Sequence, residues 1–298
     1  MYMEMKEYQY HDVHFRGTIE RVIYMTTNPE GEPREKYANI YLPYGYDHND
    51  SGKKYNILYM MHGGGGNPDA WLDCSKIKNM LDYCIDAKEV EPLIVVFPSF
   101  YKEQVCRVGK PVPEVEGRKT LEFLPELTAE LLPAVEGKYH GYAADTTPEE
   151  LRAVRNHRGF GGFSMGSCTT WHVLCQKLDY FAWFVPMSGD CWAVQPQGGK
   201  FCTRETATYI HDAVAKWGLP PDAYHIFAAT GSEDPAHLAL TPQIEAMKQD
   251  TNIFTYSEDA ATGNLHYGVK PGAVHAYEAV YHYLYTYLPY LFQEEATK

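Results

Sequence analysis

The chain has 298 residues, of which 45% are apolar and 22% charged, and its formal net charge is −13 at pH 7. A chain of this length buries about 75% of its unfolded surface and needs no metal or disulfide to fold, and the negative charge argues against nucleic acid and anionic membranes as main partners. The sequence also contains no run of about 18 apolar residues, which excludes a transmembrane helix.

The strand patterns along the chain are those of a central sheet. Residues 12–26 and 36–43 have the aromatic and β-branched content of strands. Residues 92–99, PLIVVFPS, form a continuous apolar run, which is typical of a strand covered on both faces. Further strands are predicted over residues 57–61, 181–189, 223–231 and 252–258.

Helical patterns alternate with these strands from residue 55 onward. A threonine cap, a proline and early glutamates predict a helix over residues 147–156. Apolar spacing predicts further helices over residues 124–135, after residue 164, and over 275–292. We therefore expect an α/β fold with a mostly parallel sheet and helices on both faces. Residues 1–298 are expected to form one domain, with residues 1–35 adding strands to the same sheet.

Residues 162–166 read Gly-Phe-Ser-Met-Gly, a match to the G-x-S-x-G motif. In a nucleophile elbow this motif joins a strand directly to a helix, and the serine is held in a strained backbone geometry that projects its hydroxyl. The motif alone also fits an ordinary turn, so Ser164 becomes a candidate nucleophile only with its partners.

A nucleophilic serine needs hydrogen-bond donors for the oxyanion that forms during the reaction. The run His62-Gly63-Gly64-Gly65-Gly66 follows a predicted strand, and its backbone N–H groups can face a cleft with no side chain in the way. We expect one amide of this loop, together with the N–H of Met165, to form an oxyanion hole.

The serine also needs a base and an acid, in the chain order serine, acid, histidine. Asp234, in AATGSEDPAH, follows a predicted strand and can orient an imidazole. His275 lies on a glycine-containing loop before the last helix and is the predicted base. The rival candidates are Glu233 and Asp190 for the acid and His266 for the base.

Metal chemistry has little support in the sequence. The chain has no H-E-x-x-H and no C-x-x-C motif, and His62 is interpreted as a structural histidine, so neither a metal nor a cofactor is predicted. An odd number of cysteines without close pairs favours reduced, packed thiols over a disulfide framework; they are Cys74, Cys84, Cys106, Cys168, Cys175, Cys191 and Cys202.

From about residue 36 onward, nearly the whole chain resembles the carbohydrate esterase family 1 feruloyl esterases, domains often attached to bacterial xylanases. The segments that carry the resemblance, in order, are ANIYLPYGYD, YNILYMMHGGGGNPDAWL, PLIVVFPS, LPELTAELLPAVEGKY, RGFGGFSMGS, ATGSEDP and GAVHAYEAVYHYL. The plain GGGG loop, the stretch of residues 138–156 and the segment SGDCWAVQPQGGKF depart from the family pattern.

The resemblance implies an α/β-hydrolase fold without a large cap domain. It also implies hydrolysis of esters that join hydroxycinnamic acids, mainly ferulate, to arabinose on plant xylan. The expected partner is thus a feruloylated xylo-oligosaccharide or a small phenolic ester. The family's site residues match these positions: Ser164 as nucleophile, Asp234 as acid, His275 as base, Gly63, Gly64 and Met165 as oxyanion donors, and Trp71 as the aromatic residue after the glycine loop.

Two tryptophans, Trp71 and Trp192 of the distinctive SGDCW segment, are candidate substrate-binding walls for an aromatic acyl pocket, with a place in the core as the alternative for each. The alternative functions are an acetyl-xylan or small acyl esterase on the same scaffold, and a non-catalytic carbohydrate-binding scaffold. The opening residues, MYMEMKEYQYHDV, lack a signal-peptide pattern. The protein is therefore expected in the cytoplasm, or secreted with its signal peptide absent from this sequence.

Overall fold

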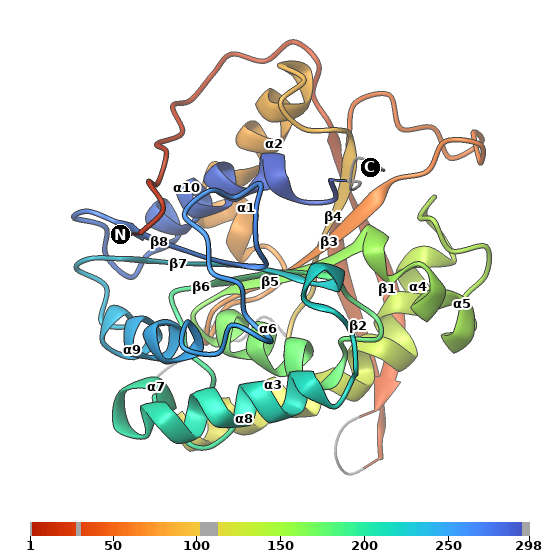
Figure 1. Ribbon diagram of the computed structural model, residues 1–298. Helices are drawn as coiled ribbons and strands as arrows, with labels where there is room; N and C mark the ends of the chain where they lie inside the picture. Colours follow the sequence, from red (N-terminus) through yellow and green to blue (C-terminus); the bar gives the residue numbers. More distant parts are fainter. Residues whose placement is uncertain (1, 28–30, 102–112, 294–298) are drawn as a thin grey trace.

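The computed structural model describes residues 2–27, 31–101 and 113–293. Within these residues, eight strands form one sheet in the order β1-β2-β4-β3-β5-β6-β7-β8 (Figure 1). The pairs β1–β2 and β2–β4 are antiparallel, and all pairs from β4 to β8 are parallel. The strands are β1 (Thr18–Thr27), β2 (Pro33–Leu42), β3 (Asn56–Met61), β4 (Leu93–Phe97), β5 (Arg158–Phe163), β6 (Trp183–Met187), β7 (His225–Gly231) and β8 (Leu265–Lys270).

Helices connect the parallel strands, as βα alternation requires. In chain order they are α1 (Ala70–Cys74), α2 (Ile77–Asp86), α3 (Pro113–Glu126), α4 (Leu132–Glu136), α5 (Pro148–Ala153), α6 (Met165–Gln176), α7 (Gly198–Phe201), α8 (Thr203–Ala215), α9 (His237–Met247) and α10 (Tyr277–Tyr287). A π-helical turn (Leu127–Leu131) joins α3 to α4 without a break, and single 3₁₀ turns occupy Arg155–His157, Pro221–Ala223 and Leu288–Tyr290.

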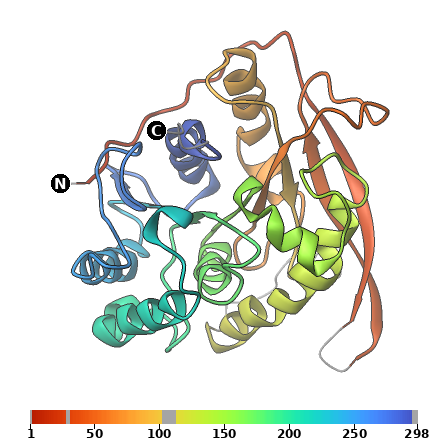
Figure 2. The same cartoon turned by 45° about the vertical axis from the view of Figure 1, so that its right-hand side comes forward.

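Each face of the sheet is covered by its own set of helices. Helices α1, α2 and α10 pack on one face, and α3, α4, α6, α8 and α9 pack on the other (Figures 1 and 2). Strands β3, β4 and β5 lie between the two layers and are almost wholly buried. This explains the apolar runs of β3 and β4, and it confirms the predicted α/β class with helices on both faces.

The strand predicted over residues 252–258 is wrong. That segment consists of turns, and only Tyr256 forms an isolated bridge, to Leu265. The side chain of Asn264 holds the turn, because it accepts from the amide of Thr255 and donates to the carbonyl of Ile253. The strand that completes the sheet is β8, which follows this turn.

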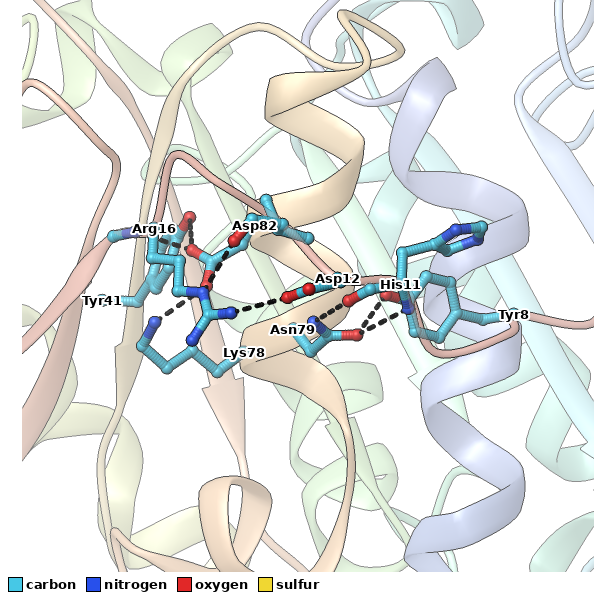
Figure 3. A network of polar contacts seen from close by, with 10 residues as sticks. Tyr8, His11, Asp12, Arg16, Tyr41, Lys78, Asn79 and Asp82 are labelled. Atoms are coloured by element: carbon cyan, nitrogen blue, oxygen red, sulfur yellow. Dashed lines mark hydrogen bonds and ion pairs between the residues drawn. The ribbon is translucent and has the colours of Figure 1, made fainter.

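The N-terminal segment, residues 2–17, crosses helices α2 and α10. The Tyr8 hydroxyl donates to Asn79 of α2 at 2.5 Å (Figure 3). The Tyr8 amide donates to Nδ1 of His282 in α10 at 3.0 Å. At the end of the segment, the Gly17 amide donates to Asp82 at 2.7 Å. The segment therefore connects α2 and α10, which pack on the same face of the sheet. Helix α10 begins two residues after His275.

None of the helices within the described ranges is both long enough and apolar enough to cross a membrane. The cysteines in those ranges are all free thiols, and Cys106 lies outside them.

Candidate active site

Ser164 occupies the sharp turn between β5 and α6. Its backbone has φ 58° and ψ −114°, a conformation that residues with a side chain rarely adopt. A Cβ on Gly162 would lie 2.6 Å from the backbone of Gly166, and a Cβ on Gly166 would lie 2.4 Å from the Met61 carbonyl oxygen. The two glycines of the motif are therefore needed for strand and helix to approach each other, while the Ser164 amide donates to the Met187 carbonyl at 2.9 Å.

The structure brings Ser164, His275 and Asp234 into one chain of hydrogen bonds. His275 Nε2 lies 2.8 Å from Ser164 Oγ, and His275 Nδ1 lies 2.8 Å from Asp234 Oδ1. A carboxylate can only accept, so Nδ1 carries the proton and donates it to Asp234. The lone pair of Nε2 is then directed at the serine hydroxyl, which is the arrangement that a general base requires.

Asp234 is held rigidly in the loop after β7. Its side chain is 0% exposed, whereas that of His275 is 36% exposed. Its Oδ1 also accepts from the amide of Ala236 at 2.8 Å. Its buried Oδ2 has no hydrogen-bond partner among the described residues. The carboxylate is thus fixed by its own loop, and the imidazole that it orients remains open to solvent.

The rival residues lie elsewhere. Glu233 is exposed and contributes only its amide, which donates to the Ala273 carbonyl. Asp190 is buried, accepts from Trp192 and from the Gly199 amide, and has its pKa raised by that burial. His266 lies inside β8 with Nδ1 against the Ser257 carbonyl, and burial lowers its pKa to about 4. None of the three forms a hydrogen bond to Ser164 or His275 within the described part of the chain.

His62 organises the glycine loop that faces Ser164. Its Nδ1 lies 2.7 Å from the Gly63 carbonyl, so this nitrogen donates, and Nε2 accepts from the Ser99 hydroxyl at 2.9 Å. Burial lowers the pKa of His62 to about 4, which keeps the ring neutral. A Cβ on Gly63 would lie 3.4 Å from the Ser164 Cβ, so the loop runs directly beside the nucleophile.

Two tyrosines belong to the site although sequence reasoning missed them. The Gly63 amide donates to the Tyr277 hydroxyl oxygen at 3.0 Å, and the Gly65 amide donates to the Tyr101 hydroxyl oxygen at 3.2 Å. Tyr277 lies 214 residues from Gly63 in sequence, and nothing in its spacing separates it from the other tyrosines of the last helix. Of the expected oxyanion donors, Gly63 is therefore engaged by a side chain, whereas the amides of Gly64 and Met165 have no hydrogen-bond partner within the described ranges.

The two candidate pocket tryptophans differ in position. Trp71 is 1% exposed, and its indole N–H donates to the Met61 carbonyl at 3.2 Å. It supports the glycine loop from inside and has no surface free for a ligand. Trp192 is half-buried, and its indole N–H donates to Asp190 at 2.9 Å, next to the start of α3. Trp192 is thus a fixed aromatic side chain with part of its surface open.

In the described ranges, no cluster of three or more histidine, cysteine or acidic side chains is arranged to hold a metal ion. The histidines of the candidate site are bonded to carboxylate, hydroxyl and carbonyl oxygens instead. The candidate site thus brings together a serine, a histidine, a carboxylate and backbone amides.

Comparison with known proteins identifies relatives over most of the chain. The Esterase family model, described as "Putative esterase", matches residues 32–290. Endo-1,4-beta-xylanase Y of Acetivibrio thermocellus is 45% identical over 262 residues, which cover 87% of this chain and 22% of that protein. An endo-1,4-beta-xylanase/feruloyl esterase of Xylanibacter ruminicola is 27% identical over 177 residues, or 58% of this chain and 22% of the relative. The chain thus spans about a fifth of the length of the curated relatives that it matches.

Solved structures show the same fold. The feruloyl esterase module from Clostridium thermocellum, a mutant complexed with sinapinate, is 39% identical with a TM-score of 0.79, over 98% of this chain and 99% of that one. A ferulic acid esterase from Anaeromyces mucronatus in complex with ferulic acid has a TM-score of 0.67 at 18% identity, over 93% of this chain and 91% of the other. At that identity the second match supports the fold alone.

Proposed function

The chain belongs to the esterase family, and from that premise we propose that it hydrolyses esters of hydroxycinnamic acids, mainly ferulate, carried on arabinoxylan-type polysaccharide or oligosaccharide. The observation that carries the proposal is the continuous contact from Asp234 through His275 to Ser164, with 2.8 Å at each step. The 45% identity to a xylanase and the 39% identity to a feruloyl esterase module support the choice of substrate.

The geometry accounts for each proton in the reaction. Ser164 Oγ attacks the ester carbonyl carbon while His275 Nε2 takes the hydroxyl proton, and Asp234 stabilises the imidazolium that forms. The tetrahedral intermediate collapses, the imidazolium gives its proton to the leaving sugar hydroxyl, and the acyl group stays on Ser164. Water then attacks the acyl-enzyme with His275 again as base, which releases the free acid and the serine.

Backbone amides stabilise the oxyanion of this intermediate. The Met165 amide lies at the start of α6, where N–H groups have no partner within the helix and the helix dipole favours negative charge. A single oxyanion donor of this kind contributes about 3–4 kcal/mol to transition-state stabilisation. The glycine loop beside Ser164 supplies the second donor.

Trp192 is the proposed contact for the phenolic ring of the acyl group. Its indole N–H is fixed on Asp190, so the ring keeps one orientation while part of it stays open. A rigid aromatic face binds a planar hydroxycinnamoyl group by stacking at little cost in conformational entropy. An acetyl group offers nothing for such a face to bind.

The proposal is tested by assaying methyl ferulate, a feruloylated arabinoxylan oligosaccharide and 4-nitrophenyl acetate side by side, with Ser164→Ala as the control. We expect the highest kcat/KM on the two ferulate esters and none above background for the variant. Activity on acetate alone would instead support a small acyl esterase. No turnover of any ester by a folded protein would support a non-catalytic carbohydrate-binding scaffold.

A further inference from the structure

Three of the four amides in the glycine loop are already engaged. The Gly63 amide donates to Tyr277, the Gly65 amide to Tyr101, and the Gly66 amide to the Gly63 carbonyl at 3.1 Å. The amide of Gly64 has no partner among the described residues, and Gly64 is also the exposed glycine of the four. The loop therefore presents one free N–H beside the nucleophile.

Both peptide groups that flank Gly63 are held in place. On one side Tyr277 accepts from its amide, and on the other the Gly63 carbonyl accepts from His62 at 2.7 Å. The Tyr277 ring itself is fixed edge-on against Trp71, with centroids 5.2 Å apart, and against Phe163, with centroids 4.8 Å apart. A side chain locked in this way can hold the loop with little loss of entropy during the reaction.

The Tyr277 hydroxyl is suited to this contact. Burial raises the pKa of Tyr277 well above its usual value, so the group stays a neutral hydroxyl at any pH at which the enzyme works. Its oxygen can accept from the amide without placing a phenolate near the developing oxyanion. Tyr277 follows His275 by two residues and begins α10, so the residue that holds the glycine loop lies directly after the loop that carries the proposed base.

We propose that Tyr277 is a positioning residue that holds the Gly63 amide, so that the Gly64 amide completes the oxyanion hole with Met165. The inference rests on the proposed ester hydrolysis by Ser164. It differs from the expectation that the Gly63 amide itself binds the oxyanion, because that amide already donates to Tyr277. Without the hydroxyl, the His62–Gly63 peptide can rotate, so the backbone at Gly63 is held only on its carbonyl side and the Gly64 amide is positioned less firmly.

The test is Tyr277→Phe, which keeps the ring packing and removes the hydroxyl, with Tyr281→Phe on the same helix as the matched control. For Tyr277→Phe we expect kcat on methyl ferulate to fall by about ten- to hundredfold with KM nearly unchanged. A boronic acid that forms a tetrahedral adduct on the serine should lose affinity by the same factor, whereas the product ferulate should bind as before. Unchanged kcat, or an equal loss of boronate and ferulate affinity, would overturn the proposal.

A second measurement needs no variant and so does not depend on how Tyr277→Phe folds. In wild-type protein labelled with ¹⁵N-glycine, formation of the boronate adduct should move the Gly64 amide proton strongly downfield and leave Gly63 nearly unmoved. A downfield shift at Gly63 would overturn the inference. If Ser164→Ala remained active, the proposed function would fail instead, so the two failures are distinguishable.

Discussion

The two ends of strand β5 differ in solvent exposure and in how their side chains are bonded. At its carboxyl end the chain turns through the strained backbone of Ser164, and the hydroxyl meets the partly open imidazole of His275. At its amino end, Arg158 is 1% exposed and makes two hydrogen bonds to Glu136, at 2.6 and 2.8 Å. The remaining nitrogen of that guanidinium donates to two backbone carbonyls, at 2.7 Å each.

The difference shows how one strand serves stability and chemistry at once. At the amino end Arg158 and Glu136 are buried and paired with each other, so neither charge is available to react. At the carboxyl end Ser164, the proposed nucleophile, is only half-buried, and its backbone strain costs of order 1–3 kcal/mol. We infer that the fixed end keeps β5 in register while the strained end positions the nucleophile.

The largest effect on stability is expected from Arg158→Met. The change leaves the buried Glu136 carboxylate without its cation, and we expect the free energy of unfolding to fall by about 3–5 kcal/mol. The kcat of the molecules that remain folded should stay within about twofold of the wild type, because the site lies at the other end of the strand. Urea unfolding and active-site titration measure the two quantities.

Two further variants serve as comparisons for Arg158→Met. Arg152→Met removes an exposed ion pair with Asp179 and should cost no more than about 1 kcal/mol. Adding Glu136→Leu to Arg158→Met should recover much of the lost stability, because no unpaired charge remains. If the three proteins were equally stable, or if Arg158→Met lost its kcat, the separation between the two ends of β5 would be wrong.

A smaller effect is expected from His172 in α6, the helix that Ser164 begins. Burial lowers its pKa to about 4, and neither ring nitrogen has a hydrogen bond to a described residue. The unfolded chain binds a proton near pH 6.5, so stability falls as the pH drops from about 6.5 towards 4. The stability advantage of His172→Leu over the wild type should therefore be about 1 kcal/mol greater at about pH 5.5 than at neutral pH.

Urea unfolding at the two pH values checks this prediction, since His172→Leu removes the proton uptake without removing a hydrogen bond. A difference between variant and wild type that did not change with pH would contradict it. The test also asks whether α6, the helix that follows Ser164, carries an acid-sensitive cost in stability.

A sequence motif predicted the part of the site whose geometry depends on residues close together in the chain. The glycines around Ser164 are required by the close approach of β5 and α6, so the motif carries its own structural reason. Asp234 and His275 could be preferred over the rival acids and histidine only because of their order in the chain and their positions after predicted strands. The structure places their side chains in contact, and their catalytic roles remain a proposal.

The remaining features depend on contacts between distant segments. Strand β8 was missed because its sequence includes Gly268 and has few strand-forming residues, yet a Cβ on Gly268 would meet the Met5 side chain from the N-terminal segment. Residues 252–258 have strand-like composition, but a side chain nine residues further on holds their turn. Tyr277 acquires its role only when α10 packs beside the glycine loop.

The most direct test of the central claim is to label the protein with a fluorophosphonate and locate the adduct by peptide mass spectrometry. Ser164 should carry a single adduct, and Ser164→Ala should carry none. Ser188 is a stringent internal comparison, because it follows β6 with the same φ of 58° but is 1% exposed. An adduct on Ser188 or another residue, or labelling that persists in Ser164→Ala, would contradict the proposal that Ser164 is the nucleophile.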